Sequence, residues 1–539
     1  MCLAQTGACW RSFSGQQSRP AECTAAWQGT ATKASITGLN CKVARFRNVD
    51  GYTTYDAMGL AELIQSDEVK PAEVLEAARS RADEVNPRIN AIVVNIDPAA
   101  AAESSDAPFS GVPFLIKDLL QHLAGYPTSG GSRSLAAVPA TETATVVQRW
   151  LDAGLVIFGK TNTPELGASA ITEPELFGPA RNPWKTDHTP GGSSGGAAAA
   201  VAAGIVPCAG ASDGGGSIRI PASACGLFGL KASRGLIPAG PAHAEYLGGT
   251  ATDGVISRSV RDSAAMLDVM AGPTPVSPYL SAQTPSPYLD EVGRAPGRLR
   301  IGACTSSSIN AHPHPEAMAA VAGAADLLTD LGHDVAQLSR APFDDAALPR
   351  DFLTIHFVNC AFFVDEAKAT SEADDSAFEL NTRFMAAMGR ATKSVELILA
   401  LERRQQYVRQ LADFHQSYDL LLTPTTATPP PRVGAFNLSP ALRMAAQGLL
   451  SARAAGLLRR FTPIVDQVIA DHLGWVPYTQ LANLTGRPAM TVPLHWTTDG
   501  LPIGVQFVGR LGAEGQLIRL ASQLEQATPW ADRRPDLKE

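Results

Sequence analysis

Two short segments rich in glycine and serine contain the residues best suited to covalent chemistry. Residues 191–196 read Gly-Gly-Ser-Ser-Gly-Gly, and residues 213–219 read Asp-Gly-Gly-Gly-Ser-Ile-Arg. The three glycines before Ser217 remove side chains from a run of backbone amides, and such amides can converge on a developing negative charge as an oxyanion hole. Ser217 is therefore a candidate nucleophile, and Asp213 and Arg219 could form an ion pair that holds its loop. Taken singly, each segment also fits an ordinary turn or helix N-terminus.

A serine nucleophile needs a base, and histidine is the usual one. The ten histidines do not lie in comparable settings, so we expect them to be solvated or structural. Lys117 instead ends the apolar run 112–116, where burial would lower its pKa and leave the amine neutral near neutral pH. The sequence favours Lys117 as the base, and a solvated strand end is the alternative interpretation.

Two generic motifs match literally but fail in their context. Residues 154–161 satisfy the P-loop formula, yet the residues between the two glycines are large and apolar, so we expect a buried strand there. Residues 191–195 satisfy the nucleophile-elbow formula, but an elbow follows a buried strand, and residues 181–190 read as a loop. We therefore expect neither an NTPase nor an α/β-hydrolase.

The elements that would position these residues alternate between helices and strands. Apolar residues recur at helical spacing over 58–64 and 74–85, and a long helical region is expected from about 346 to 415. This alternation predicts an α/β protein with a largely parallel sheet. The expected strands cover 91–94, 112–116, 155–158, 205–209, 300–303, 420–422, 489–493 and 503–508.

Composition and charge exclude several function classes. The 52 acidic and 44 basic residues are spread along the chain without a long run of like charge, so we expect no nucleic-acid partner. We expect no membrane association either, since no apolar stretch reaches the roughly 18 residues of a membrane span. The eight cysteines form neither a disulfide framework nor a zinc pattern, which favours the cytoplasm.

Residues 1–50 differ from the rest of the chain. They show no sustained periodicity, contain only the acidic residues Glu22 and Asp50, and lack the apolar core of a signal peptide. We expect a disordered extension or a non-native leader here. A single domain should follow over residues 51–535.

Together these segments resemble the amidase signature family, and the likeness extends over roughly residues 53–535. It implies the amidase signature fold, an α/β fold with a large, mixed, mostly parallel twisted β-sheet covered by helices on both faces. The motifs that carry the resemblance are Gly-Lys-Thr-Asn at 159–162, Pro-Gly-Gly-Ser-Ser-Gly-Gly at 190–196, Gly-Gly-Ser-Ile-Arg at 215–219, Gly-Leu-Lys at 229–231, and the segments 419–424, 482–486 and 499–508.

The resemblance also implies a role for each residue of the candidate site. Ser217 would attack the amide carbonyl, and Ser193, held in a cis peptide, would pass the proton to Lys117. Water would then hydrolyse the acyl-enzyme. Neither a metal nor an organic cofactor is implied. The amides of Gly214, Gly215, Gly216 and Ser217 would hold the oxyanion, and Ser194, Asp213 and Arg219 would support the site.

Within the family, the chain is similar to bacterial amidases that act on aryl, alkyl or small cyclic amides. That branch includes 6-aminohexanoate cyclic dimer hydrolases, aryl acylamidases and enzymes active on carbamates. The resemblance therefore implies an amidohydrolase for a small-molecule amide, acting on carbon–nitrogen bonds other than peptide bonds. The sequence is compatible with a homodimer but does not require one.

Two questions remain open at this point, one about the function and one about a cysteine. The first is whether the chain is instead a glutamine amidotransferase A-type subunit that supplies ammonia to a partner. Such subunits usually carry a Tyr-Gly-Arg-Val-Ser stretch, and its replacement by residues 234–238 here argues against this alternative. The second concerns Cys360, in the apolar helical run 355–364. It is either part of the acyl pocket or an inert buried thiol, and the latter is favoured.

Overall fold

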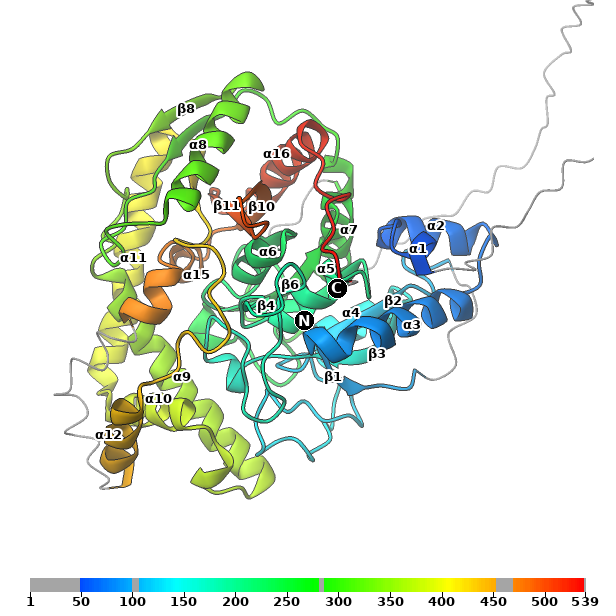
Figure 1. The fold of residues 1–539 in the computed structure, drawn as a ribbon. Helices are drawn as coiled ribbons and strands as arrows, with labels where there is room; N and C mark the ends of the chain where they lie inside the picture. The colour runs from blue at the N-terminus through cyan, green and yellow to red at the C-terminus, as the bar shows by residue number, and fades with distance from the viewer. Residues whose placement is uncertain (1–48, 99–105, 281–285, 452–468, 538–539) are drawn as a thin grey trace, which may run out of the picture. The chain divides into compact units, whose positions relative to one another are not determined.

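The structure, a computed structural model, describes residues 49–98, 106–280, 286–451 and 469–537. Its centre is an 11-stranded sheet with the order β1-β3-β2-β4-β6-β5-β10-β11-β9-β7-β8 (Figure 1). The strands are β1 (Ile92–Asn95), β2 (Pro113–Lys117), β3 (Val156–Thr161), β4 (Cys208–Asp213), β5 (Phe228–Lys231), β6 (Thr252–Ser257), β7 (Arg300–Ala303), β8 (Asp334–Gln337), β9 (Leu420–Pro424), β10 (Ala489–Trp496) and β11 (Pro502–Val508).

Helices flank this sheet, and α9, α10 and α12 lie together at the lower left of Figure 1. None of the helices in the described ranges is long and apolar enough to cross a membrane. The α-helices are α1 (Val49–Tyr52), α2 (Ala57–Gln65), α3 (Pro71–Ile89), α4 (Thr145–Asp152), α5 (Gly195–Ala202), α6 (Arg219–Cys225), α7 (Val260–Met270), α8 (Pro315–Asp330), α9 (Leu348–Ser371), α10 (Leu380–Ala391), α11 (Ser394–Ser417), α12 (Pro440–Ser451), α15 (Gln480–Thr485) and α16 (Glu514–Ala527).

The sheet is mixed, as expected, but it is less parallel than expected. The β2–β3, β2–β4, β7–β8 and β7–β9 pairs are parallel, whereas the β1–β3, β4–β6, β5–β6, β5–β10, β10–β11 and β9–β11 pairs are antiparallel. A short connection accounts for one of the antiparallel pairs. The turn between β10 and β11 closes a hairpin, which forces antiparallel pairing, and β6 returns between β4 and β5.

Two buried elements bring the candidate site together. All five residues of β2 are buried, as a strand covered on both faces should be. Helix α5 is also buried along its whole length, since its sequence Gly-Gly-Ala-Ala-Ala-Ala-Val-Ala leaves no polar face. Small side chains let α5 approach the sheet closely, and a Cβ on Gly196 would lie 2.4 Å from the backbone nitrogen of Asn162. The residues just before α5 are thereby placed beside the end of β2.

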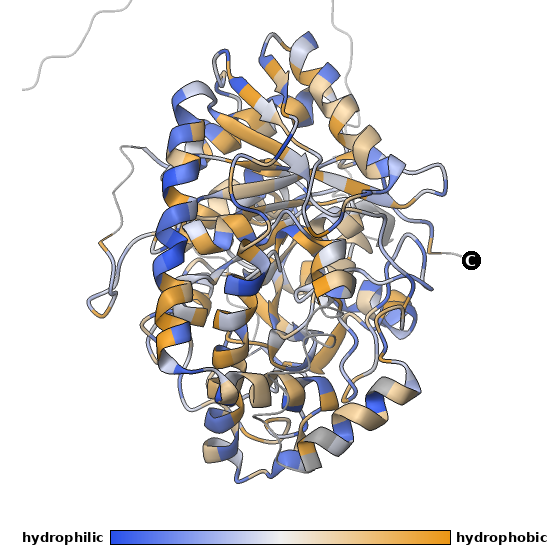
Figure 2. Cartoon of the chain, turned by 90° about the vertical axis from the view of Figure 1, so that its left-hand side faces the viewer, coloured by the Kyte–Doolittle hydropathy of each residue, from blue (hydrophilic) through white to orange (hydrophobic). Residues whose placement is uncertain are grey.

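The buried apolar residues form two main clusters. One packs helices α2 to α8 and α16 against the sheet, and the other joins α9, α10, α11 and α15. Figure 2 shows hydrophilic and hydrophobic residues alternating around the outer helices, whereas the central strands carry mostly hydrophobic residues. Phe352, Leu353 and Met385 of the second cluster also line the cavity of the candidate site.

Most sequence-predicted elements are present with small shifts. The strand expected over 205–209 begins later, at Cys208, because Ala203 and Gly204 first close the end of α5. The helical region from 346 to 415 is divided into α9, α10 and α11. Strands β5, β6 and β8 were not predicted. The extension expected over residues 1–50 lies almost entirely outside the described residues, and α1 already begins at Val49.

Candidate active site

Lys117 is the last residue of β2, and its side chain is fully buried. Its Nζ donates hydrogen bonds to Ser193 Oγ at 2.8 Å and to Ser212 Oγ at 3.1 Å. Both partners are neutral hydroxyls. The backbone N–H of Lys117 donates to Oε1 of Gln121 at 2.6 Å, which ties the strand end to the turn that follows it.

Burial has a direct electrostatic consequence for this lysine. Desolvation lowers its pKa to about 7, and the nearby charges of Asp253 and Asp213 oppose that shift only in part. Asp253 is itself buried, and Nε2 of Gln121 donates to its carboxylate at 3.1 Å. Gln121 therefore links the backbone of Lys117 to the buried carboxylate.

Ser193 lies at the turn into α5, and the peptide bond between Gly192 and Ser193 is cis, as the family resemblance implies. Its neighbour Ser194 exchanges hydrogen bonds with the backbone of Ser212, donating to the carbonyl at 3.2 Å and accepting from the amide at 3.3 Å. Ser194 thus fastens the loop before α5 to strand β4.

The loop 214–217 is held by a buried ion pair. Arg219 donates from Nε and Nη2 to the two carboxylate oxygens of Asp213, each at 2.9 Å, and both side chains are fully buried. Burial disfavours the charged Asp213, but Arg219, the charge of Lys231 and the hydrogen bond from Asn483 together hold the pKa of that carboxyl at about 2. The ion pair expected from the sequence is therefore present.

The four backbone amides of the loop are not equivalent. The amide of Gly216 donates to Oδ1 of Asp213 at 2.8 Å, whereas those of Gly214, Gly215 and Ser217 make no hydrogen bond within the described part of the chain. Gly214, Gly215 and Ser217 also line the cavity, and Gly216 does not. The structure thus leaves three of the four expected amides available to a ligand.

Glycine is required in this loop for steric reasons. Gly216 has φ +128°, and a Cβ there would lie 2.5 Å from Oγ1 of Thr479. A Cβ on Gly215 would lie 2.6 Å from Cζ of Phe352. Larger residues would therefore push the loop away from α15 and α9.

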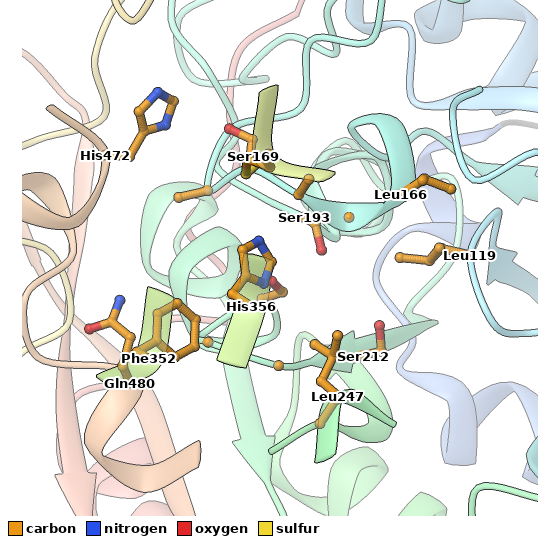
Figure 3. Close-up of a pocket in the computed structure, with 18 of the residues that line it drawn as sticks. Leu119, Leu166, Ser169, Ser193, Ser212, Leu247, Phe352, His356, His472 and Gln480 are labelled. Atoms are coloured by element: carbon orange, nitrogen blue, oxygen red, sulfur yellow. The ribbon is translucent and has the colours of Figure 1, made fainter. Parts of the chain in front are cut away.

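Ser193, Ser212 and Ser217 line one cavity of about 100 Å³, and Figure 3 shows Ser193 and Ser212 in it. Ser217 is partly exposed in it, and no hydrogen bond between described residues joins Ser217 to Ser193. The structure thus joins Lys117 to Ser193 directly and places Ser217 in the same cavity. The remaining wall is mainly apolar and includes Ile220, Leu247, Phe352, Leu353, Met385 and Val476, together with the polar side chains of Asn381, His356, His472 and Gln480.

The two histidines of this cavity, like the other residues of its wall, were not predicted as site residues by the sequence analysis. His356 follows Phe352 by one helical turn on α9, and the two rings stack with centroids 5.6 Å apart. Burial lowers the pKa of His356, and its ring also bonds the backbone of Ala168. His472 lines the same cavity. The spacing of Phe352 and His356 on a predicted helix was the one sequence feature that could have pointed to them. It does not reveal which face of that helix lies toward the serines.

His188 and His314 make no hydrogen bond to the serine and lysine side chains of the site in the described ranges. His188 bonds Asp187, and His314 caps α8. Cys360 is a buried thiol that does not line the cavity, its Sγ lies 3.7 Å from the carbonyl of Thr382, and burial raises its pKa to about 12. Cys360 is thus the inert thiol that the sequence analysis favoured.

A buried lysine bonded to a serine, a second serine on a glycine loop and a large mixed sheet are features of one enzyme class. The amidase family model matches residues 73–518, and the chain belongs to this family, the amidase signature enzymes. It is accordingly an enzyme that acts on amide carbon–nitrogen bonds.

Relatives and solved structures agree with this assignment. The chain is 36% identical over 497 residues to the 6-aminohexanoate-cyclic-dimer hydrolase of Pseudomonas sp. (strain NK87), which covers 89% of this chain and 96% of that protein. A structure of 6-aminohexanoate cyclic dimer hydrolase complexed with substrate has a TM-score of 0.82 at 34% identity, covering 90% of this chain and 100% of that one. A bacterial aryl acylamidase of the amidase signature family has a TM-score of 0.77 at 26% identity, covering 89% and 98%.

Proposed function

We propose that the chain hydrolyses small non-peptide amides through an acyl-enzyme formed on Ser217. The observation that carries the proposal is the 2.8 Å hydrogen bond between Nζ of Lys117 and Oγ of Ser193. Because desolvation lowers the pKa of Lys117 to about 7, a large fraction of the amine is neutral near neutral pH. Lys117 can then accept a proton through Ser193.

The proton path follows from these contacts. Ser217 attacks the carbonyl carbon and gives up its proton to Ser193, whose own proton passes to Lys117. When the tetrahedral intermediate collapses, Ser193 protonates the departing nitrogen and regains its proton from Lys117. Water repeats the sequence on the acyl-enzyme, releasing the carboxylic acid and restoring Ser217.

Three amides are suited to hold the oxyanion. The amides of Gly214, Gly215 and Ser217 lie on the cavity wall without protein acceptors in the described ranges. The amide of Gly216, by contrast, already donates a hydrogen bond to Asp213. Donors fixed before the reaction stabilise the oxyanion without reorganisation, and one such donor contributes about 3 kcal/mol. Asp213, Arg219 and Ser194 act by positioning the loops that carry these groups.

The substrate proposed is an aryl, alkyl or cyclic amide or a carbamate with a small acyl half. The cavity of about 100 Å³ and its apolar wall of Phe352, Leu353 and Met385 favour a compact apolar group. The relatives named above act on a cyclic amide and on aryl amides by name, which supports this choice.

Two variants test the proposal on an anilide substrate. Ser217→Ala should lower kcat by at least about a thousandfold, with an unchanged Tm, since one hydroxyl leaves no appreciable cavity. Lys117→Arg should be similarly inactive, because arginine stays charged and cannot accept the proton. A Ser217→Ala enzyme that keeps about a tenth of the wild-type rate, or a near-normal Lys117→Arg enzyme, would refute the assignment.

The glutamine amidotransferase subunit is the less supported alternative. It would need a partner to receive ammonia, and residues 234–238 lack the stretch typical of those subunits. Purified chain alone should therefore hydrolyse its substrates at full rate. A requirement for a second subunit would favour the amidotransferase instead.

A further inference from the structure

A second cavity of about 470 Å³ adjoins the catalytic cavity. Both cavities are lined by Leu119, Leu120, Leu166 and Phe363, which we call the partition. The second cavity is larger than the first, and its size falls within the usual range for small-molecule sites. The proposed reaction does not otherwise use it.

The partition has an unusual backbone. Leu120 has φ +64° and Leu166 has φ +49°, a left-handed conformation that side chains other than glycine rarely adopt. Such residues persist only where the surrounding structure enforces them, and they cluster at functional sites. Their conformation brings two leucines from separate loops to the same wall.

The partition lies on the Ser193 side of the catalytic cavity. A Cβ built on Gly167 would lie 2.6 Å from Cδ2 of Leu119 and 3.5 Å from Oγ of Ser193, so the Leu119 side chain is close to that hydroxyl. Figure 3 shows Leu119 and Leu166 on one side of Ser193, with Phe352, His356 and Gln480 on the other. In the proposed reaction Ser193 protonates the departing nitrogen, so the amine half of the amide points towards the partition.

The wall of the second cavity is acidic. Glu142 and Glu366 contribute two carboxylates, and the described residues of the wall include neither lysine nor arginine. His243 lies 3.9 Å from Glu366, and burial lowers the pKa of His122 to about 4, which leaves that ring neutral at pH 7. A cation placed in this cavity would therefore be attracted by the two carboxylates.

One lysine, Lys160, lies behind this wall, and a neighbouring carboxylate opposes its charge. Nζ of Lys160 donates to Oγ1 of Thr128, which lines the cavity. Its charge is opposed by the buried carboxyl of Asp118, to which it is electrostatically coupled. Lys160 therefore does not cancel the field of the two glutamates.

We propose that the second cavity is the subsite for the amine half of the substrate, and that Glu142 and Glu366 favour leaving amines that carry a second, cationic amino group. This inference rests on the proposed function, because it assigns the cavity through the role of Ser193. Amides of diamines are the substrate class that it selects. Amine halves that end in a carboxylate are disfavoured by the same charges.

The test uses substrates that share a butyryl group, so that all of them form the same acyl-enzyme. Their leaving groups are 1,5-diaminopentane, pentylamine and 6-aminohexanoate, and butyramide releases only ammonia. We expect kcat/KM to fall from the cationic to the neutral to the anionic leaving group. In the double variant Glu142→Gln, Glu366→Gln, the cationic-to-neutral ratio should fall about fivefold, since both glutamates are exposed and exposed charge pairs are weak.

Two further variants separate charge from space. Glu76→Gln on α3 removes the same charge from an exposed residue that lines neither cavity, and its ratio should equal that of the wild type. Thr370→Trp on α9 places a large ring in the second cavity from an exposed helix position, so it should slow the pentylamine substrate and spare butyramide.

The outcomes distinguish this inference from the proposed function. If the double variant keeps the wild-type ratio, or if Thr370→Trp slows butyramide and the pentylamine substrate equally, the subsite assignment is wrong while acylation of Ser217 stands. If the protein hydrolyses neither butyramide nor the longer amides and Ser217 is never acylated, the proposed function fails and the subsite assignment fails with it.

Discussion

Lys117 is surrounded by groups that shift its pKa in opposite directions. Desolvation lowers it, and the charges of Asp253 and Asp213 raise it, with a result of about 7. The proposed base must be neutral, so kcat/KM should fall about tenfold per pH unit below pH 7 and level off above it. A lysine exposed to solvent would show this limb near pH 10.4 instead.

Asp253→Asn should move the acidic limb of the pH–rate profile to lower pH. The substitution removes a negative charge that raises the pKa of Lys117, so the lysine stays neutral at more acidic pH. The effect should be largest above pH 6, since burial raises the pKa of Asp253 to about 6 and the carboxyl is ionised only above it. Asp330→Asn, at an exposed position on α8, is the control and should leave the profile unchanged. A limb that moves to higher pH would contradict this electrostatic account.

At the scale of single residues, sequence motifs predicted a site at Lys117, Ser193 and Ser217, because glycine loops and a buried strand end have local signatures. Gln121 and His356 were not identified. Gln121 is linked to Asp253 only because the sheet brings the two within hydrogen-bond distance, and His356 lines the cavity only because α9 covers the loop. Contacts between segments far apart in sequence leave no local pattern.

At the scale of elements, the glycine loop is fixed between β4, α6 and α15. Asn483 donates to the carbonyl and the carboxylate of Asp213, and Thr479 donates to the carbonyl of Gly215 at 2.6 Å. Arg219 reaches the carbonyl of Thr479 at 2.9 Å. The loop is therefore braced from both sides.

Arg219→Met should destabilise the protein by about 3–5 kcal/mol, because it leaves the carboxylate of Asp213 buried without its cationic partner. It should also lower kcat, since the loop loses its support. Chemical denaturation and anilide kinetics measure the two effects. Arg432→Met provides the matched control: its pair with Asp187 is exposed, and such pairs contribute about 1 kcal/mol or less. Equal stability losses in the two variants would show that the buried pair is unimportant.

Apolar patterns in the sequence predicted some strands of the sheet and missed others. Apolar runs predicted β2, β3, β9 and β11 within a few residues, but β5 and β6 were missed. Gly229 and Gly254 interrupt their apolar patterns, and both are sites where a Cβ would lie within 3 Å of Ile218 or a neighbouring side chain. Close packing, which the sequence does not display locally, requires glycine there.

At the scale of the whole molecule, the folded body is anchored from its first helix. Oη of Tyr52 donates to the carbonyl of Ile205 at 2.8 Å, and both residues are buried. Val49–Tyr52 is therefore part of the body, whereas residues 1–48 remain a predicted extension. A homodimer, with which the sequence is compatible, is not tested by the structure, and light scattering in solution can test it.

Deleting residues 1–48 should leave Tm and kcat/KM unchanged, because that segment shows no apolar periodicity that folding would bury. Deleting residues 1–52 should lower Tm, since it also removes the buried Tyr52. Thermal unfolding of the two truncated proteins measures this difference. A clear loss of Tm in the shorter deletion would mean that the extension packs on the body.

Mass spectrometry of the intact protein after treatment with a fluorophosphonate tests the central claim most directly. We expect one adduct per chain, mapped by peptide analysis to Ser217 and absent from the Ser217→Ala variant, with labelling strongly slowed in Lys117→Arg. An adduct on Ser193 or on another serine, or undiminished labelling of the Ser217→Ala variant, would contradict the assignment of Ser217 as the nucleophile.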